Sequence, residues 1–123
     1  MLSLEEFIAL CKQYCPEWKQ YEDWTTITGE YLVTFNDTCE YALCLYQYKQ
    51  NKIFMPYAIS YEAGDYIVLT DKGEPAIDWE ELIKINVEDP DAKDRVIAIL
   101  TKLHQDYKQI HNKFKLKKIK EDF

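Results

Sequence analysis

Glycine is scarce in this chain, with three residues among 123. A loop that cradles phosphates needs glycines, because its backbone must adopt conformations closed to other residues and approach the ligand closely. The sequence contains neither a P-loop nor a dinucleotide-binding fingerprint. We therefore exclude these nucleotide-binding motifs and expect no bound cofactor.

Long apolar runs are also missing. No stretch of the sequence approaches the roughly 20 apolar residues that are needed to cross a bilayer. The first ten residues, MLSLEEFIAL, lack the basic segment, the apolar run and the small-residue cleavage site of a signal peptide. The sequence therefore predicts a cytoplasmic protein without membrane contact.

Positive charge is scarce over most of the chain. Residues 1–107 carry nine Lys and Arg against 20 Asp and Glu, whereas residues 108–123 carry six lysines against two acids. An acidic body repels the phosphates of nucleic acids. Nine of the ten tyrosines lie within residues 14–66, where few basic residues are present to support stacking on bases. We therefore expect no nucleic-acid partner and place the tyrosines in a core or at a protein interface.

The composition is nevertheless that of one folded domain. Hydrophobic residues make up 47% of the chain and aromatic residues 15%, which is enough for a core. A chain of this length buries roughly two thirds of its surface on folding. Because no repeat or low-complexity linker interrupts it, the sequence predicts a single domain over residues 1–123. This domain comprises an acidic body (1–107) and a basic helical extension (108–123).

The hydrophobic periodicity predicts an α+β fold. Ser3 and Glu6 form a capping-box pattern ahead of a helical apolar stripe, which Pro16 ends. In residues 25–70 the period changes to two, and short turn segments favour an antiparallel meander of about four strands. Pro56 predicts an edge or a bulge in the third strand. The predicted strands are EYLVTF (30–35), EYALCLYQY (40–48), KIFMPYAISY (52–61) and DYIVLT (65–70).

Two helices are predicted in the C-terminal third. The segment DWEELIKI (78–85) places Asp78 at the N-cap and Glu81 three residues later, which predicts a short helix. Asp89 and Pro90 then open the last helix, as its cap and its first turn. Neither glycine nor proline follows Pro90, so this helix is expected to run for about thirty residues, or ~45 Å.

The four cysteines are the candidates for metal or thiol chemistry. Cys11 and Cys15 lie one helical turn apart on the apolar stripe, and Cys39 and Cys44 are spaced to face opposite sides of a strand. A zinc site needs convergent ligands at spacings such as C-x2-C. We therefore expect reduced thiols in the core and no metal site.

Histidine offers an enzymatic alternative. His104 and His111 lie seven residues apart on one side of the last predicted helix and could act as the base for a cysteine nucleophile. No flanking motif places a cysteine beside them. We therefore expect no enzymatic activity, and a small thiol enzyme is the competing interpretation.

The last helix carries the strongest interaction signal. Apolar residues recur at coiled-coil spacing from Val96 to Phe114, and beyond Phe114 the stripe shifts and is interleaved with lysines. A helix of ~45 Å overhangs strands of ~17–20 Å, so its last turns are expected to dock on an acidic protein surface. Whether the seam over residues 96–114 packs on its own sheet or on another chain stays open. The expected interaction residues are Tyr107, Ile110, Phe114, Leu116, Lys117, Lys118, Ile119, Lys120 and Phe123.

Two functions fit these features. The leading interpretation is a non-enzymatic assembly or adaptor protein that binds other copies of itself or an assembly neighbour. A composition rich in Lys, Tyr, Ile, Asn and acids, with few Gly, Arg or Ala, is typical of an AT-rich genome. Small acidic α+β proteins without catalytic motifs are common among phage and mobile-element products, which suggests a virion or connector component. The alternative is a small acidic inhibitor or immunity protein that blocks a basic site on a nucleic-acid-processing enzyme.

Overall fold

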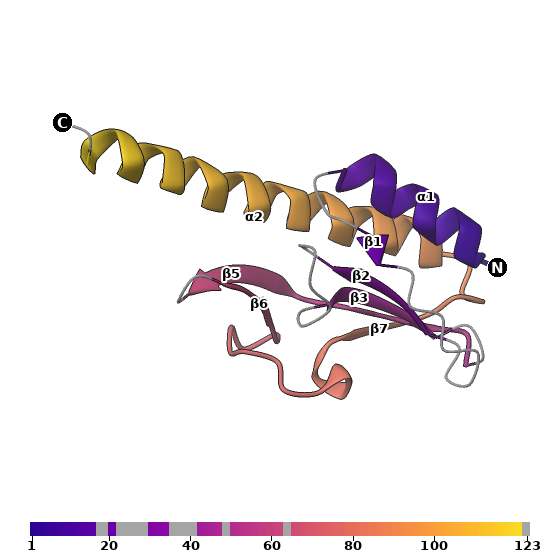
Figure 1. Ribbon diagram of the computed structural model, residues 1–123. Helices are drawn as coiled ribbons and strands as arrows, with labels where there is room; N and C mark the ends of the chain where they lie inside the picture. Colours follow the sequence, from indigo (N-terminus) through magenta and orange to yellow (C-terminus); the bar gives the residue numbers. More distant parts are fainter. Residues whose placement is uncertain (17–19, 22–29, 35–41, 48–49, 63–64, 122–123) are drawn as a thin grey trace.

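The computed structural model describes residues 1–16, 20–21, 30–34, 42–47, 50–62 and 65–121, with the backbone alone for 20–21, 30–34, 42–43, 65 and 114–121. It confirms the predicted α+β arrangement of an N-terminal helix, antiparallel strands, a short turn of helix and a long C-terminal helix (Figure 1). The elements are α1 (Leu4–Tyr14), β1 (Gln20–Tyr21), β2 (Glu30–Thr34), β3 (Ala42–Gln47), β4 (Lys52–Met55), β5 (Ala58–Glu62), β6 (Asp65–Leu69), the 3-10 turn η1 (Trp79–Glu81), β7 (Ile83–Asn86) and α2 (Ala92–Glu121).

The strands form two antiparallel sheets. Five of them lie in the order β1-β2-β3-β4-β7, and β5 and β6 form a separate two-stranded hairpin. Helices α1 and α2 lie together over one face of the larger sheet, and the middle of α2 passes over β5 (Figure 1). The hairpin therefore lies next to the middle turns of the long helix.

Helix α1 begins and ends as predicted. The Ser3 hydroxyl accepts the Glu6 amide at 3.1 Å, so Ser3 is the N-cap. The Glu6 carboxylate accepts a hydrogen bond from the Ser3 hydroxyl at 3.3 Å. The helix ends at Tyr14, and Cys15 closes it by donating its amide to the Cys11 carbonyl at 2.9 Å. These local signals are enough to fix the helix ends.

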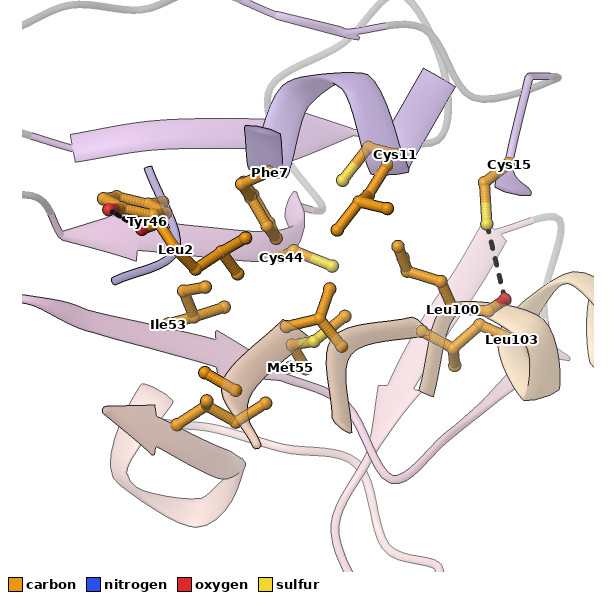
Figure 2. Packing of buried hydrophobic residues seen from close by; sticks show 14 of the residues in the cluster. Leu2, Phe7, Cys11, Cys15, Cys44, Tyr46, Ile53, Met55, Leu100 and Leu103 are labelled. Carbon is orange, nitrogen blue, oxygen red and sulfur yellow. Dashed lines mark hydrogen bonds between the residues drawn. The ribbon is translucent and has the colours of Figure 1, made fainter. Parts of the chain in front are cut away.

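The main core lies between the two helices and the larger sheet (Figure 2). Tyr46 closes one end of it, because its hydroxyl donates to the Leu2 carbonyl at 2.9 Å and its ring lies 5.5 Å from that of Phe7. Burying a large apolar side chain contributes about 1.5–3 kcal/mol, so this cluster is the main source of stability. Its members with 0 or 1% exposure are Phe7, Cys11, Cys15, Cys44, Ile53, Met55, Ile85, Val87, Ala92, Val96, Leu100 and Leu103.

The opposite face of the larger sheet has a smaller apolar cover. Leu45 and Phe54 are 0% and 4% exposed, and Leu82 is 5% exposed. The Trp79 ring lies 6.4 Å from the Phe54 ring. The segment around η1 therefore folds back under the sheet, and β3 and β4 have buried residues on both faces.

The third predicted strand, 52–61, is broken at Pro56 into two strands of different sheets. Because proline has no amide hydrogen, it cannot continue the ladder. Strand β4 ends at Met55, and β5 begins at Ala58. Tyr57 lies at the bend and is 39% exposed, so the alternation predicted across this segment is interrupted there.

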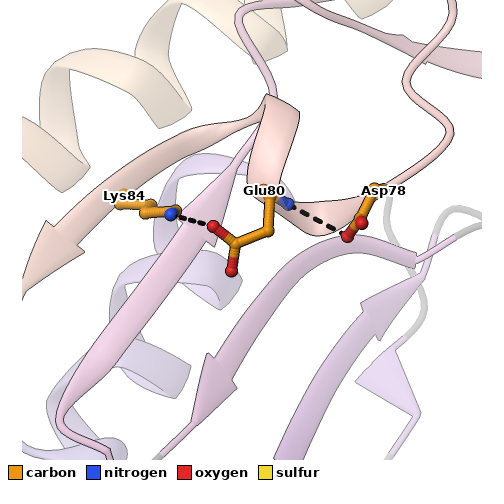
Figure 3. A network of polar contacts seen from close by, with 3 residues as sticks. All are labelled: Asp78, Glu80 and Lys84. Carbon is orange, nitrogen blue, oxygen red and sulfur yellow. Dashed lines mark hydrogen bonds and ion pairs between the residues drawn. The ribbon is translucent and has the colours of Figure 1, made fainter.

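The helix predicted over DWEELIKI is wrong beyond its first turn (Figure 3). Asp78 does cap that turn, because its carboxylate accepts the Glu80 amide at 3.2 Å, and Lys84 forms an ion pair with Glu80. The chain then becomes β7, which pairs with β4 and places Ile85 opposite Ile53. The ladder offered by β4 and the two-residue alternation of this segment outweigh its local helix signal.

Helix α2 has the predicted length of 30 residues. It begins at Ala92, slightly later than predicted. The Ala92 amide donates to the Asp89 carbonyl and forms a turn, and the first helical hydrogen bond follows, from the Arg95 amide to the Asp91 carbonyl. In the part of the chain that the structure describes, no helix is both long and apolar enough to cross a membrane.

Candidate interaction site

Helix α2 is divided between its own core and the solvent. Leu100 and Leu103 are fully buried, and Tyr107 and Ile110 are half-buried against the same core cluster. The next three residues, 111–113, are exposed. The predicted seam therefore packs on the body of its own chain as far as Ile110. For that stretch, packing on another chain is excluded.

The predicted interaction residues fall into three groups. Tyr107 and Ile110 contact the body of their own chain. Phe123 lies outside the described residues. The last turns of α2, at the yellow end in Figure 1, extend beyond both sheets. These turns contain the backbone of the remaining predicted residues, Phe114, Leu116, Lys117, Lys118, Ile119 and Lys120.

A series of stacked rings fastens the hairpin to α2. The Tyr61 and Tyr66 rings meet edge to face at 5.0 Å, and Tyr66 stacks on Tyr107 with centroids 5.7 Å apart and planes 25° apart. The His111 ring also stacks on Tyr107, with the ring centroids 6.1 Å apart. These contacts join β5, β6 and α2 at the point where the helix leaves the core.

We expect the Tyr66–Tyr107 pair to be energetically coupled. A double-mutant cycle with Tyr66→Leu and Tyr107→Leu should give a coupling of about 0.5–1.5 kcal/mol, the range for stacked aromatic pairs. Urea unfolding of the four proteins measures it. A cycle of Tyr66→Leu with the exposed Gln105→Leu serves as the control and should show additive effects. Equal coupling in both cycles would contradict the stacking.

A groove lies between β5 and α2, with a volume of about 430 Å³. Lys102 lines this groove and connects α2 to the bend before β5, because its ammonium donates to the Tyr57 carbonyl at 3.0 Å. The same ammonium donates to the Asp106 carboxylate at 3.1 Å. Sequence reasoning missed this groove, and Pro56 is the only signal that pointed toward it. Its lining residues are Ala58, Ile59, Ser60, Tyr61, Lys102, Asp106, Gln109, Ile110 and Lys113.

The described cysteines, Cys11, Cys15 and Cys44, are buried in the core, as predicted. Burial raises the pKa of Cys11 to about 12. Burial, followed by the charges of Cys11 and Cys15, also raises the pKa of Cys44. The Cys15 thiol donates to the Leu100 carbonyl at 3.6 Å (Figure 2). Cys39 lies outside the described residues. Nucleophilic cysteines need a lowered pKa and access to solvent. Cys11 and Cys44 are buried and have a raised pKa, so their surroundings are those of core side chains.

Stability is expected to fall at alkaline pH because of these thiols. An exposed thiol ionises near pH ~8.5, whereas folded Cys11 keeps its proton up to about pH 12. Between these values the unfolded state binds fewer protons, so unfolding is favoured by about 1.4 kcal/mol per pH unit for each such thiol. Urea unfolding between pH 8 and 10.5 should show a shallower decline in Cys11→Ala than in the wild type. Identical slopes would contradict the burial of this thiol.

The described residues contain no group of three or more His, Cys, Asp or Glu side chains placed to hold a metal ion. Comparison of the chain with models of protein families, with curated proteins and with solved structures found no match. The geometry of α2 and the groove beside it is therefore what supports a function.

Proposed function

We propose that the chain is a non-enzymatic assembly or adaptor protein whose C-terminal helix docks on an acidic surface of a neighbour, in the first place another copy of the chain. The observation that carries this proposal is that α2 continues for 11 residues beyond Ile110, the last of its described side chains that packs on the core cluster. That extension is about 16 Å long at 1.5 Å per residue.

An unsupported helical extension has little stability of its own. Isolated helices shorter than ~12–15 residues are marginal in water, so a partner that covers the last turns stabilises them. The extension combines Leu116, Ile119 and Phe123 with lysines in the sequence, whereas residues 1–107 carry an excess of acids. The body of another copy therefore has the charge that this extension needs. The composition supports a virion or connector component as the biological setting.

Molar mass by light scattering tests the proposal. We compare the full chain with a chain ending at Lys113, which keeps every described side chain of α2 and removes residues 114–123. The full chain is expected to self-associate with rising concentration and to dissociate in high salt. The shortened chain is expected to be a folded monomer, with a circular dichroism spectrum that loses only the signal of the helical residues removed. Two folded monomers, or equal association of both chains, would show that the extension is not a docking element.

A further inference from the structure

We infer that the groove between β5 and α2 binds an extended segment of a protein partner, in which acidic and apolar residues alternate, and that this segment adds as a strand to the open edge of β5. The inference rests on the proposed function in one respect, since the neighbour on which α2 docks is expected to supply the segment.

The backbone of β5 is directed so that it can receive a strand. In the described chain β5 pairs only with β6. The Tyr57 carbonyl points to α2, where it accepts from Lys102 at 3.0 Å, so the Ala58 amide of the same peptide unit points the opposite way, toward β6. Because these directions alternate along a strand, the amide and carbonyl of Ile59 face the groove.

The backbone of Ile59 is short of hydrogen-bond partners at this edge. The residue is 6% exposed, and among the described residues no backbone hydrogen bond connects it to α2 or to any strand other than β6. Nearly buried backbone amides and carbonyls are paired in the great majority of cases. A strand lying in the groove would pair both groups, as in other complexes formed by strand addition.

The helical wall of the groove selects the side chains of the segment. Asp106, Gln109, Ile110 and Lys113 share one face of α2. Asp106 is already bonded to Lys102, whereas Lys113 is exposed and has no ion pair in the described part of the chain.

The groove therefore has an apolar floor, formed by Ile59 and Ile110, and one unmatched positive charge. Successive side chains of an extended peptide point to opposite sides, so apolar residues can face the floor while acidic residues face Lys113. Its volume of about 430 Å³ lies within the range of ~300–1,000 Å³ that is usual for ligand sites. The lysines that follow Lys113 attract the same acidic segment.

Selection from a random library of ten-residue peptides displayed on yeast tests the inference. Peptides are selected on the wild type and then measured on Gln109→Trp, which fills the groove from an exposed position. Gln105→Trp is the matched control, since Gln105 is also exposed on α2 but does not line the groove. Enriched peptides should alternate apolar and acidic residues and bind Gln109→Trp at least about tenfold more weakly, with unchanged binding to Gln105→Trp.

Three outcomes would overturn the inference. The first is that selection yields no peptide that binds the wild type more tightly than Gln109→Trp. The second is that the enriched peptides bind both tryptophan variants equally. The third is that Lys113→Glu leaves the preference for acidic peptides unchanged. Circular dichroism and urea unfolding confirm that each variant is folded.

The chain ending at Lys113 separates this inference from the proposed function, because it retains the groove. Peptide binding by this shortened chain, together with a full chain that stays monomeric, would leave the groove standing and refute the docking helix. Self-association of the full chain without peptide binding would refute the groove alone.

Discussion

Leu103→Ala is expected to lower the free energy of unfolding by about 2–5 kcal/mol. Leu103 is 0% exposed and belongs to the core cluster between α2 and the larger sheet. Removing its side chain takes away buried apolar surface and leaves a cavity that the surrounding side chains fill only in part. Urea unfolding followed by circular dichroism measures the change.

Two variants further along α2 show where the helix leaves the core. Ile110→Ala is expected to cost less than Leu103→Ala, because Ile110 is only half-buried. Gln105→Ala, at an exposed position, should change the free energy of unfolding by no more than about 0.5 kcal/mol. Equal losses at Leu103 and Ile110 would contradict the division of α2 into a buried and an exposed part.

Reversing three charges in the extension is expected to have the largest effect on association. The variant Lys117→Glu, Lys118→Glu, Lys120→Glu should associate at least about tenfold more weakly than the wild type, because attraction to an acidic partner becomes repulsion. These residues lie in the last turns of α2, beyond the described side chains that pack on the core cluster, so the free energy of unfolding should change little. Analytical ultracentrifugation measures both the affinity and its dependence on salt.

A matched control variant has the same net charge as this extension variant but leaves the extension unchanged. Lys52, Lys72 and Lys93 are exposed, have no ion pair among the described residues and lie outside the extension. Reversing these three should leave association at least tenfold stronger than in the extension variant, because the docking helix is intact. If both triple variants lose association equally, net charge alone controls it and the extension has no specific role.

The parts of the fold that depend on local chemistry were predictable from the sequence. Ser3 caps α1 through a neighbour three residues away, and the absence of glycine and proline after Pro90 predicted the 30-residue length of α2. Burial of Cys11 and Cys15 followed from their place on one apolar stripe. In each case the deciding interactions lie within a few residues of one another.

The segment after Asp78 shows where local chemistry is not enough. Its capping signal is real, because Asp78 accepts the Glu80 amide. The segment nevertheless becomes a strand at Ile83, because β4 lies beside it and offers a ladder to residues about thirty positions away in the sequence. A pattern read within one window contains no information about that neighbour.

The candidate site was predictable only in part, for the same reason. The seam of α2 was visible as a spacing of apolar residues, but which of them the body covers depends on where the sheet ends. The groove depends on a break at Pro56 and on a contact between Tyr57 and Lys102, which are 45 residues apart. Neither the placement of the hairpin under α2 nor the direction of its edge follows from the periodicity.

Amide hydrogen exchange along α2, measured at low and at high protein concentration, tests the central claim most directly. Backbone amides of residues 96–110 are expected to be protected at both concentrations, because their protection comes from the core of the same chain. Amides of residues 114–121 are expected to exchange rapidly in dilute solution and to become protected at high concentration. Equal exchange of residues 114–121 at the two concentrations would contradict the claim that these turns dock on a neighbouring copy.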